Sequence, residues 1–285
     1  MKYAICQELF ENWDWTRQCR FISETGYTGI ELAPFTLASR ITEVSPARRR
    51  ELKSEAADYG LTICGLHWLL AKTEGFHLTT NDRAIRKATT NYLIELGKAC
   101  ADLGGEVMVF GSPAQRNLQP GVSREEAYAN AAEVFREALP AFADRGVKIV
   151  MEPLTTKETD FVNTCAEAIE LIDRVGHPGI VLHQDVKAML SESIPIPELI
   201  HRYAPVTGHF HVNDDNLLGP GMGRTDYRPI IKALLETNYS GWVSVEVFDY
   251  KPGAEFIARE SLGYLKRIVD EVSAAGTPTG NGDRL

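Results

Sequence analysis

The sequence has little positive charge, no long apolar run and no paired cysteines. Its 30 Lys and Arg residues are outnumbered by 39 Asp and Glu residues, and the net charge of −9 argues against the basic face that nucleic-acid binding normally needs. No apolar run reaches membrane-spanning length, and the first residues, MKYAICQELFENWDW, contain no signal-peptide core. We therefore expect a cytoplasmic protein that binds neither nucleic acid nor membranes. Composition leaves open whether it forms a homo-oligomer.

Disulfides are not expected either. The five cysteines are odd in number and show neither a CxxC motif nor paired spacing. Scattered thiols of this kind are typical of a reducing compartment, where most serve as small core residues. They are Cys6, Cys19, Cys64, Cys100 and Cys165.

What the sequence does contain is a regular alternation of strand-like and helix-like segments. Strands are predicted for residues 2–10, 29–33, 61–70, 106–113, 147–154, 179–186, 206–213 and 241–250. Helices are predicted for residues 14–26, 47–60, 82–103, 123–146, 165–175, 196–203, 227–236 and 255–272. Asp14 and Gly26 suit the two caps of the first helix, and Ser123 with Glu126 resembles a capping box.

Eight strand–helix repeats in 285 residues predict an α/β protein, a (β/α)8 TIM barrel with a single domain. We expect the barrel to occupy residues 1–276 and residues 277–285 to form a flexible C-terminal tail. The competing fold is a doubly wound open sheet, which typically carries a glycine-rich phosphate motif after its first strand. That motif is missing, because GYTGIE precedes a strand instead of following one. In a TIM barrel, functional residues lie at the carboxyl ends of the strands.

The stretch at residues 206–227, VTGHFHVNDDNLLGPGMGRTDY, combines a strand with a polar loop. His209 and His211 share one face of this strand, because side chains alternate with a period of two. Turn-forming Asn and Asp residues and a glycine-rich loop follow. Taken alone, the stretch permits two readings: part of a polar site, or two histidines satisfied within the strand.

Four potential metal ligands recur once per strand–helix unit on the last four predicted strands. They are separated by 33, 26 and 35 residues, close to the repeat of about 31 residues in a barrel of roughly 250. A carboxylate at a strand end is costly to bury unless it is paired or bound to a cation. Three carboxylates and one imidazole predict one divalent ion, Mn²⁺ foremost, with Mg²⁺, Co²⁺ or Zn²⁺ as options. The alternative is four unrelated ion pairs or helix caps. The four residues are Glu152, Asp185, His211 and Glu246.

Motifs spread over the chain resemble those of the xylose isomerase-like TIM-barrel superfamily of sugar isomerases and epimerases. They are MEPLTTKETDFVNT, LHQDVKAM, HFHVNDDN…GPGMGR and SVEVFDY, and they are most similar to the D-tagatose 3-epimerase and D-psicose epimerase group. The resemblance implies that the four residues above bind one divalent metal. It also implies that Glu152 and Glu246 act as the acid/base pair, and that Glu158 contacts the substrate.

The sequence departs from this group at two substrate-binding positions. Ala188 stands where the group has a histidine three residues after the metal-binding aspartate, and Leu217 stands where it has an arginine. Arg224 matches a second arginine of the group. We therefore expect the metal site and fold to be retained, and a sugar other than D-tagatose or D-psicose to be the efficient substrate.

Other polar residues near strand ends are further candidates for substrate binding. His67 ends the third predicted strand and His183 shares a face with the metal-site aspartate; each could equally be a hydrogen-bonded histidine without a catalytic role. His209 lies one layer deeper in the barrel than His211, so we expect it to support the site by packing or hydrogen bonding and not to bind the metal. Arg116 with Glu31 could hold substrate hydroxyls, or both could be solvated loop charges.

These observations favour a metal-dependent isomerase or epimerase of a small sugar or polyol derivative, with a role in carbohydrate metabolism. One glutamate would remove a proton next to a carbonyl to give an enediolate, and the other would return a proton. The same residues could expel a β-hydroxyl, as in a dehydratase that resembles inosose dehydratase. An endonuclease IV-like repair enzyme would need more histidines at strand ends and a less acidic surface. A non-catalytic sugar-binding barrel would not need a base on each side of the sugar.

Overall fold

The computed structural model describes residues 1–275 as a closed barrel of eight parallel strands in the order of the sequence. The first and last strands pair in parallel and close the barrel. The strands are β1 (Lys2–Cys6), β2 (Gly29–Leu32), β3 (Thr62–Leu66), β4 (Val107–Phe110), β5 (Lys148–Met151), β6 (Ile180–Asp185), β7 (Thr207–Val212) and β8 (Trp242–Val245). The prediction of a (β/α)8 TIM barrel is confirmed. The expected tail, residues 277–285, lies outside the described residues.

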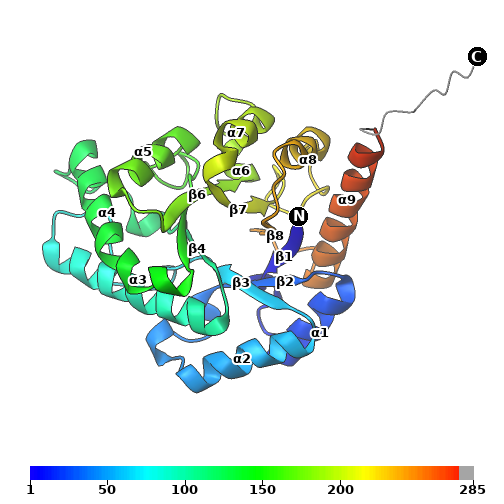
Figure 1. The fold of residues 1–285 in the computed structure, drawn as a ribbon, viewed down its shortest axis with the longest axis horizontal. Helices are drawn as coiled ribbons and strands as arrows, with labels where there is room; N and C mark the ends of the chain where they lie inside the picture. The colour runs from blue at the N-terminus through cyan, green and yellow to red at the C-terminus, as the bar shows by residue number, and fades with distance from the viewer. Residues whose placement is uncertain (276–285) are drawn as a thin grey trace, which may run out of the picture.

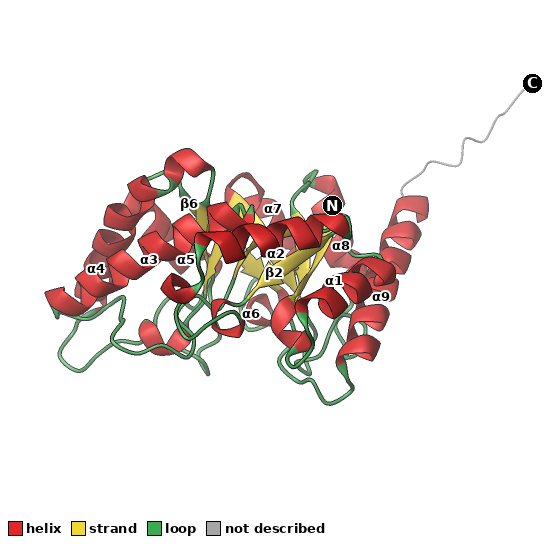
Figure 2. Ribbon diagram, turned by 90° about the horizontal axis from the view of Figure 1, so that it is seen from below, coloured by secondary structure: helices red, strands yellow, loops and turns green. Residues whose placement is uncertain are grey.

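Helices surround the barrel, as Figure 1 shows. Figure 2 shows that long loops gather on one side together with α6, which follows the carboxyl end of β6. That side is therefore where functional residues are expected in this fold. The helices are α1 (Trp15–Thr25), α2 (Pro46–Asp58), α3 (Arg83–Leu103), α4 (Arg124–Ala138), α5 (Cys165–Val175), α6 (Val186–Met189), α7 (Ile196–Tyr203), α8 (Tyr227–Glu236) and α9 (Ala254–Ala275). None of the helices within residues 1–275 has the length and apolar character needed to span a membrane.

Local signals in the sequence account for where the helices begin and end. The side chain of Asp14 accepts a hydrogen bond from the backbone of Arg17 at the start of α1, and Gly26 ends that helix with a φ of 101°. The predicted capping box is present at the start of α4. The prediction of one helix from 123 to 146 is wrong beyond Ala138: two 3₁₀ turns replace it there, because a proline at position 140 cannot donate the helical hydrogen bond.

Apolar side chains fill the space between the strands and the surrounding helices. The large cluster of buried residues draws on every strand and every long helix, and aromatic pairs such as Phe110 with Phe135 contribute to it. All five cysteines are buried free thiols, as expected from their spacing. The inside of the barrel is different, because buried histidines and carboxylates lie there.

Close packing between α3 and the segment after α4 gives a test of this core. A Cβ atom at Gly97, in the middle of α3, would overlap the buried ring of Phe142. We expect Gly97→Ala to lower the free energy of unfolding by about 1–3 kcal/mol, the usual cost of overpacking. Urea denaturation followed by circular dichroism measures the change.

The matched control is Gly263→Ala in α9, where a Cβ would meet no atom within 4 Å among the described residues. This substitution should leave stability unchanged or raise it by up to about 1 kcal/mol, because alanine is the better helix former. Equal effects of the two substitutions would show that the contact with Phe142 is not tight.

Candidate active site

The four predicted metal ligands meet at the carboxyl ends of the last four strands. Glu152 follows β5, Asp185 ends β6, His211 lies in β7 and Glu246 follows β8. Asp185 and His211 are ladder partners, and the backbone N–H of Glu246 donates to the carbonyl of Val212. All four side chains are buried, and one potential ligand atom of each lies within 4.8 Å of the others. Their once-per-unit spacing in the sequence thus becomes one cluster in space.

Asp185 is fixed in place by hydrogen bonds to both of its carboxylate oxygens. It is the last residue of β6 and also the N-cap of α6, where its Oδ1 accepts a hydrogen bond from the backbone N–H of Ala188 at 2.8 Å. Its Oδ2 accepts a second hydrogen bond from Nδ2 of Asn213 at 2.6 Å. Because both oxygens are held, the carboxylate cannot turn away from the cluster.

His211 lies between two carboxylates. Its Nδ1 is 3.2 Å from Oε2 of Glu246, and its Nε2 is 3.1 Å from both carboxylate oxygens of Glu31 at the end of β2. Burial alone would lower the pKa of His211, but Glu31 and Glu246 outweigh burial and hold it well above the ordinary value. Glu31 also accepts a hydrogen bond from His209 at 2.9 Å, which gives His209 the supporting role expected of it.

The two glutamates of the cluster have pKa values shifted in opposite directions. Burial, together with the nearby charges of Glu246 and Asp185, raises the pKa of Glu152 well above its ordinary value. Burial also tends to raise the pKa of Glu246, but His211 and its hydrogen bond outweigh that effect and lower it. The two carboxyl groups therefore differ in their preference for a proton, as the members of an acid–base pair commonly do.

The cluster fits a divalent cation. Within residues 1–275, the ion-pair partners of these carboxylates are histidines; the charge of Lys187 also acts on them, but its ion pair is with Glu158. Three buried carboxylates without a Lys or Arg partner leave negative charge that an ion would neutralise. Three oxygen donors and one imidazole nitrogen suit Mn²⁺, Mg²⁺ or Co²⁺, and Zn²⁺ also accepts this set.

A cavity of ≈70 Å³ lies against these residues. Its walls include Glu152 and Glu246, and also Glu158 and His67, two of the predicted substrate contacts. Gly111, directly after β4, forms another wall, and a Cβ atom there would overlap the carboxylate of Glu152. A side chain at this position would therefore displace the glutamate or fill the cavity.

Lys187 is a wall of the cavity that sequence reasoning missed. Its Nζ donates to Oε1 of Glu158 at 2.6 Å and lies 3.8 Å from the centre of the Phe248 ring. The other carboxylate oxygen of Glu158 accepts hydrogen bonds from the backbone and hydroxyl of Thr155. The available signal was a cation two residues after the predicted metal-binding aspartate; the next residue, Ala188, is buried.

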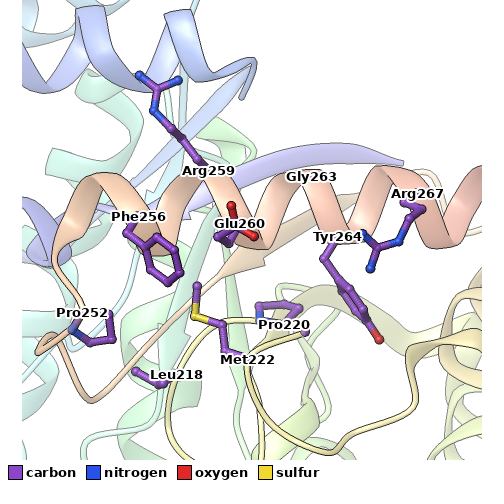
Figure 3. A pocket seen from close by; sticks show the side chains of 11 residues that line it. Leu218, Pro220, Met222, Pro252, Phe256, Arg259, Glu260, Gly263, Tyr264 and Arg267 are labelled. Carbon is purple, nitrogen blue, oxygen red and sulfur yellow. The ribbon is translucent and has the colours of Figure 1, made fainter.

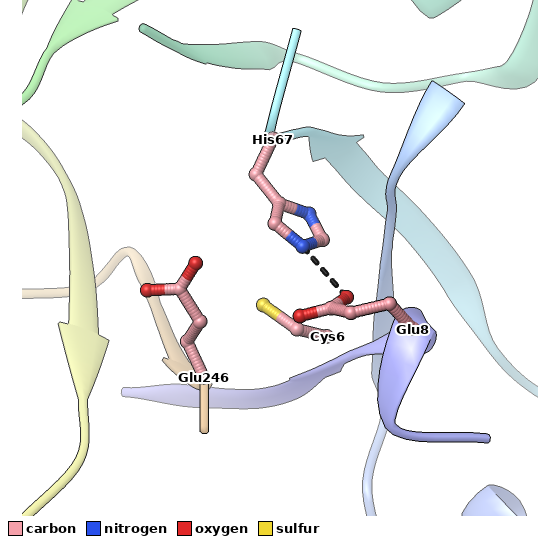
Figure 4. Close-up of side chains that lie close together, drawn as sticks. All are labelled: Cys6, Glu8, His67 and Glu246. Carbon is pink, nitrogen blue, oxygen red and sulfur yellow. Dashed lines mark hydrogen bonds and ion pairs between the residues drawn. The ribbon is translucent and has the colours of Figure 1, made fainter. Parts of the chain in front are cut away.

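Trp68 and Glu8 were also missed as polar contacts of the site. The indole Nε1 of Trp68 donates to Oε1 of Glu246 at 3.0 Å. Nε2 of His67 lies 2.7 Å from Oε2 of Glu8, and Figure 4 shows this pair beside the thiol of Cys6, with Glu246 facing them. Glu8 closely follows the carboxyl end of β1. Functional residues of a TIM barrel lie at the carboxyl ends of its strands, so the criterion that identified the other carboxylates applies to Glu8 as well.

The structure places two predicted substrate contacts away from the cavity. Arg116 is fully buried and donates to the backbone carbonyls of Glu152 at 2.6 Å and Val162 at 3.0 Å. Arg116 therefore holds the backbone of Glu152, one of the four candidate metal ligands. The alternative that Arg116 is a solvated loop charge is wrong. The side chain of Arg224 is 92% exposed and pairs with Asp215 at 2.8 Å.

His183 lies beneath the ligand cluster. Its Nε2 is 3.8 Å from Oε1 of Glu152, and its ring centre is 4.3 Å from that of His211. Neither ring nitrogen has a hydrogen-bond partner among the described residues. Burial, together with His211 and His209, holds the pKa of His183 well below its ordinary value, so the ring is neutral. A neutral ring in this place avoids adding another positive charge beside His211.

A larger hollow lies on the outside of the barrel and has none of this chemistry. It measures ≈560 Å³, and Figure 3 shows it between α9 and the glycine-rich loop, with Phe256, Tyr264 and Met222 among its walls. None of the predicted ligands or substrate contacts lines it. We therefore assign the candidate active site to the smaller cavity at the strand ends.

Known proteins resemble this chain over most of its length. A family model described as xylose isomerase-like TIM barrel matches residues 19–268. D-psicose 3-epimerase of Agrobacterium fabrum is 25% identical over 256 residues, covering 87% of this chain and 85% of that protein. D-psicose 3-epimerase of Enterocloster bolteae is 26% identical over 264 residues, covering 89% and 84%. A solved structure of L-ribulose 3-epimerase matches with a TM-score of 0.85 at 18% identity and covers both chains completely. These relatives support the expectation of an enzyme of the isomerase or epimerase class.

The metal assignment is tested by substituting Asp185. We expect Asp185→Asn to lose most bound Mn²⁺, at least about tenfold in affinity, because a neutral amide replaces one of three carboxylates. Metal content after dialysis and isothermal titration with Mn²⁺ measure the loss, and circular dichroism checks the fold. Asp215→Asn is the control, since this acid pairs with Arg224 outside the cavity. Asp185→Asn protein that binds Mn²⁺ like the parent would show that the site is misassigned.

Proposed function

Because this chain belongs to the xylose isomerase-like TIM barrel family, we propose that it is a divalent-metal-dependent epimerase or isomerase of a ketose-like sugar. The observation that carries the proposal is the pair Glu152 and Glu246. Both line the same cavity, both belong to the ligand cluster, and their pKa values are shifted in opposite directions. The two relatives named D-psicose 3-epimerase support epimerisation over a pure binding role.

The two glutamates supply the proton transfers. A divalent ion in the cluster would polarise a substrate carbonyl and so acidify the neighbouring C–H. Glu246 takes this proton as carboxylate, and the electron pair moves onto the carbonyl oxygen to give an enediolate. Glu152, in its protonated form, then gives a proton to the opposite face of the same carbon. The carbonyl forms again, the configuration is inverted, and the two carboxyl groups have exchanged protonation states.

Lys187 and Glu158 take over substrate recognition in this proposal. Position 188 is a buried alanine and Leu217 is exposed, so neither can contact a sugar in the cavity through a polar group. The Lys187 ammonium and the Glu158 carboxylate are in contact and both line the cavity. A donor next to an acceptor suits two neighbouring hydroxyl groups of an uncharged sugar.

Solvent exchange tests the proton transfers. We expect Glu246→Gln, saturated with Mn²⁺, to exchange the substrate proton with deuterated solvent about 10²–10⁴-fold more slowly than the parent, since the amide cannot act as a base. Mass spectrometry or NMR of a panel of ketoses in D₂O measures exchange, with metal content recorded in parallel. Glu255→Gln, an exposed acid on α9, is the control. A metal-loaded Glu246→Gln protein with the parent's exchange rate would leave Glu246 as a ligand only.

Steady-state kinetics test the role of Lys187. Loss of one charge-assisted hydrogen bond to the substrate costs about 1.5–3 kcal/mol, so Lys187→Met should raise KM about tenfold or more and change kcat much less. Lys187→Arg should recover part of the loss, because it keeps the charge. Lys251→Met is the control, as this lysine is exposed beyond the strand ends. An unchanged KM in Lys187→Met would remove Lys187 from substrate recognition.

A further inference from the structure

A second hollow adjoins the candidate active site. It measures ≈360 Å³ and shares Trp68, Ser112 and Pro113 as walls with the ≈70 Å³ cavity. Its outer walls include Phe35 and Tyr250. We call it the outer pocket. Because the same three residues face both spaces, the outer pocket directly adjoins the candidate active site.

The backbone of this shared wall is unusual. Trp68 has a φ of 52° and Ser112 a φ of 40°, values that residues with a side chain rarely adopt. The hydroxyl of Ser112 accepts a hydrogen bond from the backbone N–H of Leu70 at 3.2 Å, which ties the two wall segments together. Strained residues of this kind cluster at ligand-binding sites, where the surrounding structure holds them. The strain here lies where the two hollows meet.

The size of the inner cavity requires part of a ligand to lie outside it. Pockets for small molecules usually measure about 300–1,000 Å³, so ≈70 Å³ is too little for a complete ligand, and ≈360 Å³ falls in the usual range. A sugar whose reacting carbons reach Glu152 and Glu246 therefore projects its other end past Trp68. The outer pocket is the adjoining space lined by that same residue.

The walls of the outer pocket suit a sugar ring. Phe35, Trp68 and Tyr250 offer aromatic faces, and Phe35 lies edge-on to Trp68 with ring centres 6.5 Å apart. Glu8 and Glu11 offer carboxylates that can accept hydrogen bonds from hydroxyl groups. The cation of Lys72 lies 4.1 Å from the centre of the Phe35 ring. Carboxylates outnumber cations along both hollows, so an uncharged ring is favoured over a sugar acid or sugar phosphate.

We propose that the outer pocket binds a second sugar ring, so that the preferred substrate is a neutral disaccharide-like ketose. This inference rests on the proposed function, because it assigns the reacting end of the substrate to the cavity of Glu152 and Glu246. The second ring packs against Phe35 and Tyr250, and the first lies beside Lys187 and the ligand cluster.

The experiment compares isomaltulose, a glucosyl unit on O6 of fructose, with D-fructose itself. Both sugars have the same reacting carbons, so they differ only in the second ring. With Mn²⁺-loaded parent protein in D₂O, we expect kcat/KM for proton exchange to be at least about tenfold higher with isomaltulose. Phe35→Ala and Tyr250→Ala should each remove most of this ratio by raising KM for isomaltulose. Phe256→Ala, an exposed phenylalanine on α9 away from both hollows, should preserve it.

The ratio of kcat/KM for isomaltulose to that for fructose separates loss of second-ring binding from general damage to the site. A displaced Trp68 would slow exchange with both sugars alike and leave the ratio unchanged. An equal or higher kcat/KM with fructose, or a ratio unaffected by Phe35→Ala and Tyr250→Ala, would overturn the second-ring assignment while leaving the proposed function intact. Exchange with neither sugar would count against the proposed function. In that case calorimetric titration of the Mn²⁺-loaded protein with both sugars still tests whether the outer pocket binds a second sugar ring. Tighter binding of isomaltulose that Phe35→Ala abolishes supports it, and equal or absent binding overturns it.

Discussion

Three buried carboxylates share one imidazole at the mouth of the barrel, and much of the surrounding structure is explained by that concentration of charge. Isolated buried charges cost several kcal/mol each, so the fold must either pair them or bind a cation. His211 bridges Glu246 to Glu31, and Glu31 in turn binds His209 one layer deeper. The apolar layers usual inside a TIM barrel therefore give way here to a chain of histidines and carboxylates.

The fold, and the meeting of the four candidate metal ligands, could be predicted from the sequence for the same physical reason. A strand–helix unit has a nearly fixed length, so residues that recur once per unit reach the same end of the barrel. Asp185 and His211 are register partners in the structure, and Glu152 and Glu246 each directly follow a strand. The cap of α1 at Asp14 depends on contacts within a few residues and was equally predictable.

Contacts between loops could not be predicted in this way. Arg116 reaches back to the carbonyl of Glu152 from a turn whose path has no periodicity, so its burial was invisible in the sequence. The partner of His67 is Glu8, a residue 59 positions away. The short helix α6 directs the side chain of Lys187 toward the cavity and that of Ala188 into the core. The sequence alone does not indicate this rotation of the helix.

Asp185 has two structural roles, one in the candidate metal site and one at the start of the helix beside it. The same carboxylate that belongs to the candidate ligand cluster also starts α6, and Lys187 of α6 lines the cavity at the strand ends. Under the proposed function, a bound ion and a bound sugar would therefore be connected through one carboxylate and one turn of helix. Linkage requires the effect to be mutual: by whatever factor the ion strengthens sugar binding, the sugar strengthens retention of the ion. Under that function the metal would be held most tightly while the sugar is bound, and it would be lost most readily when no sugar is present.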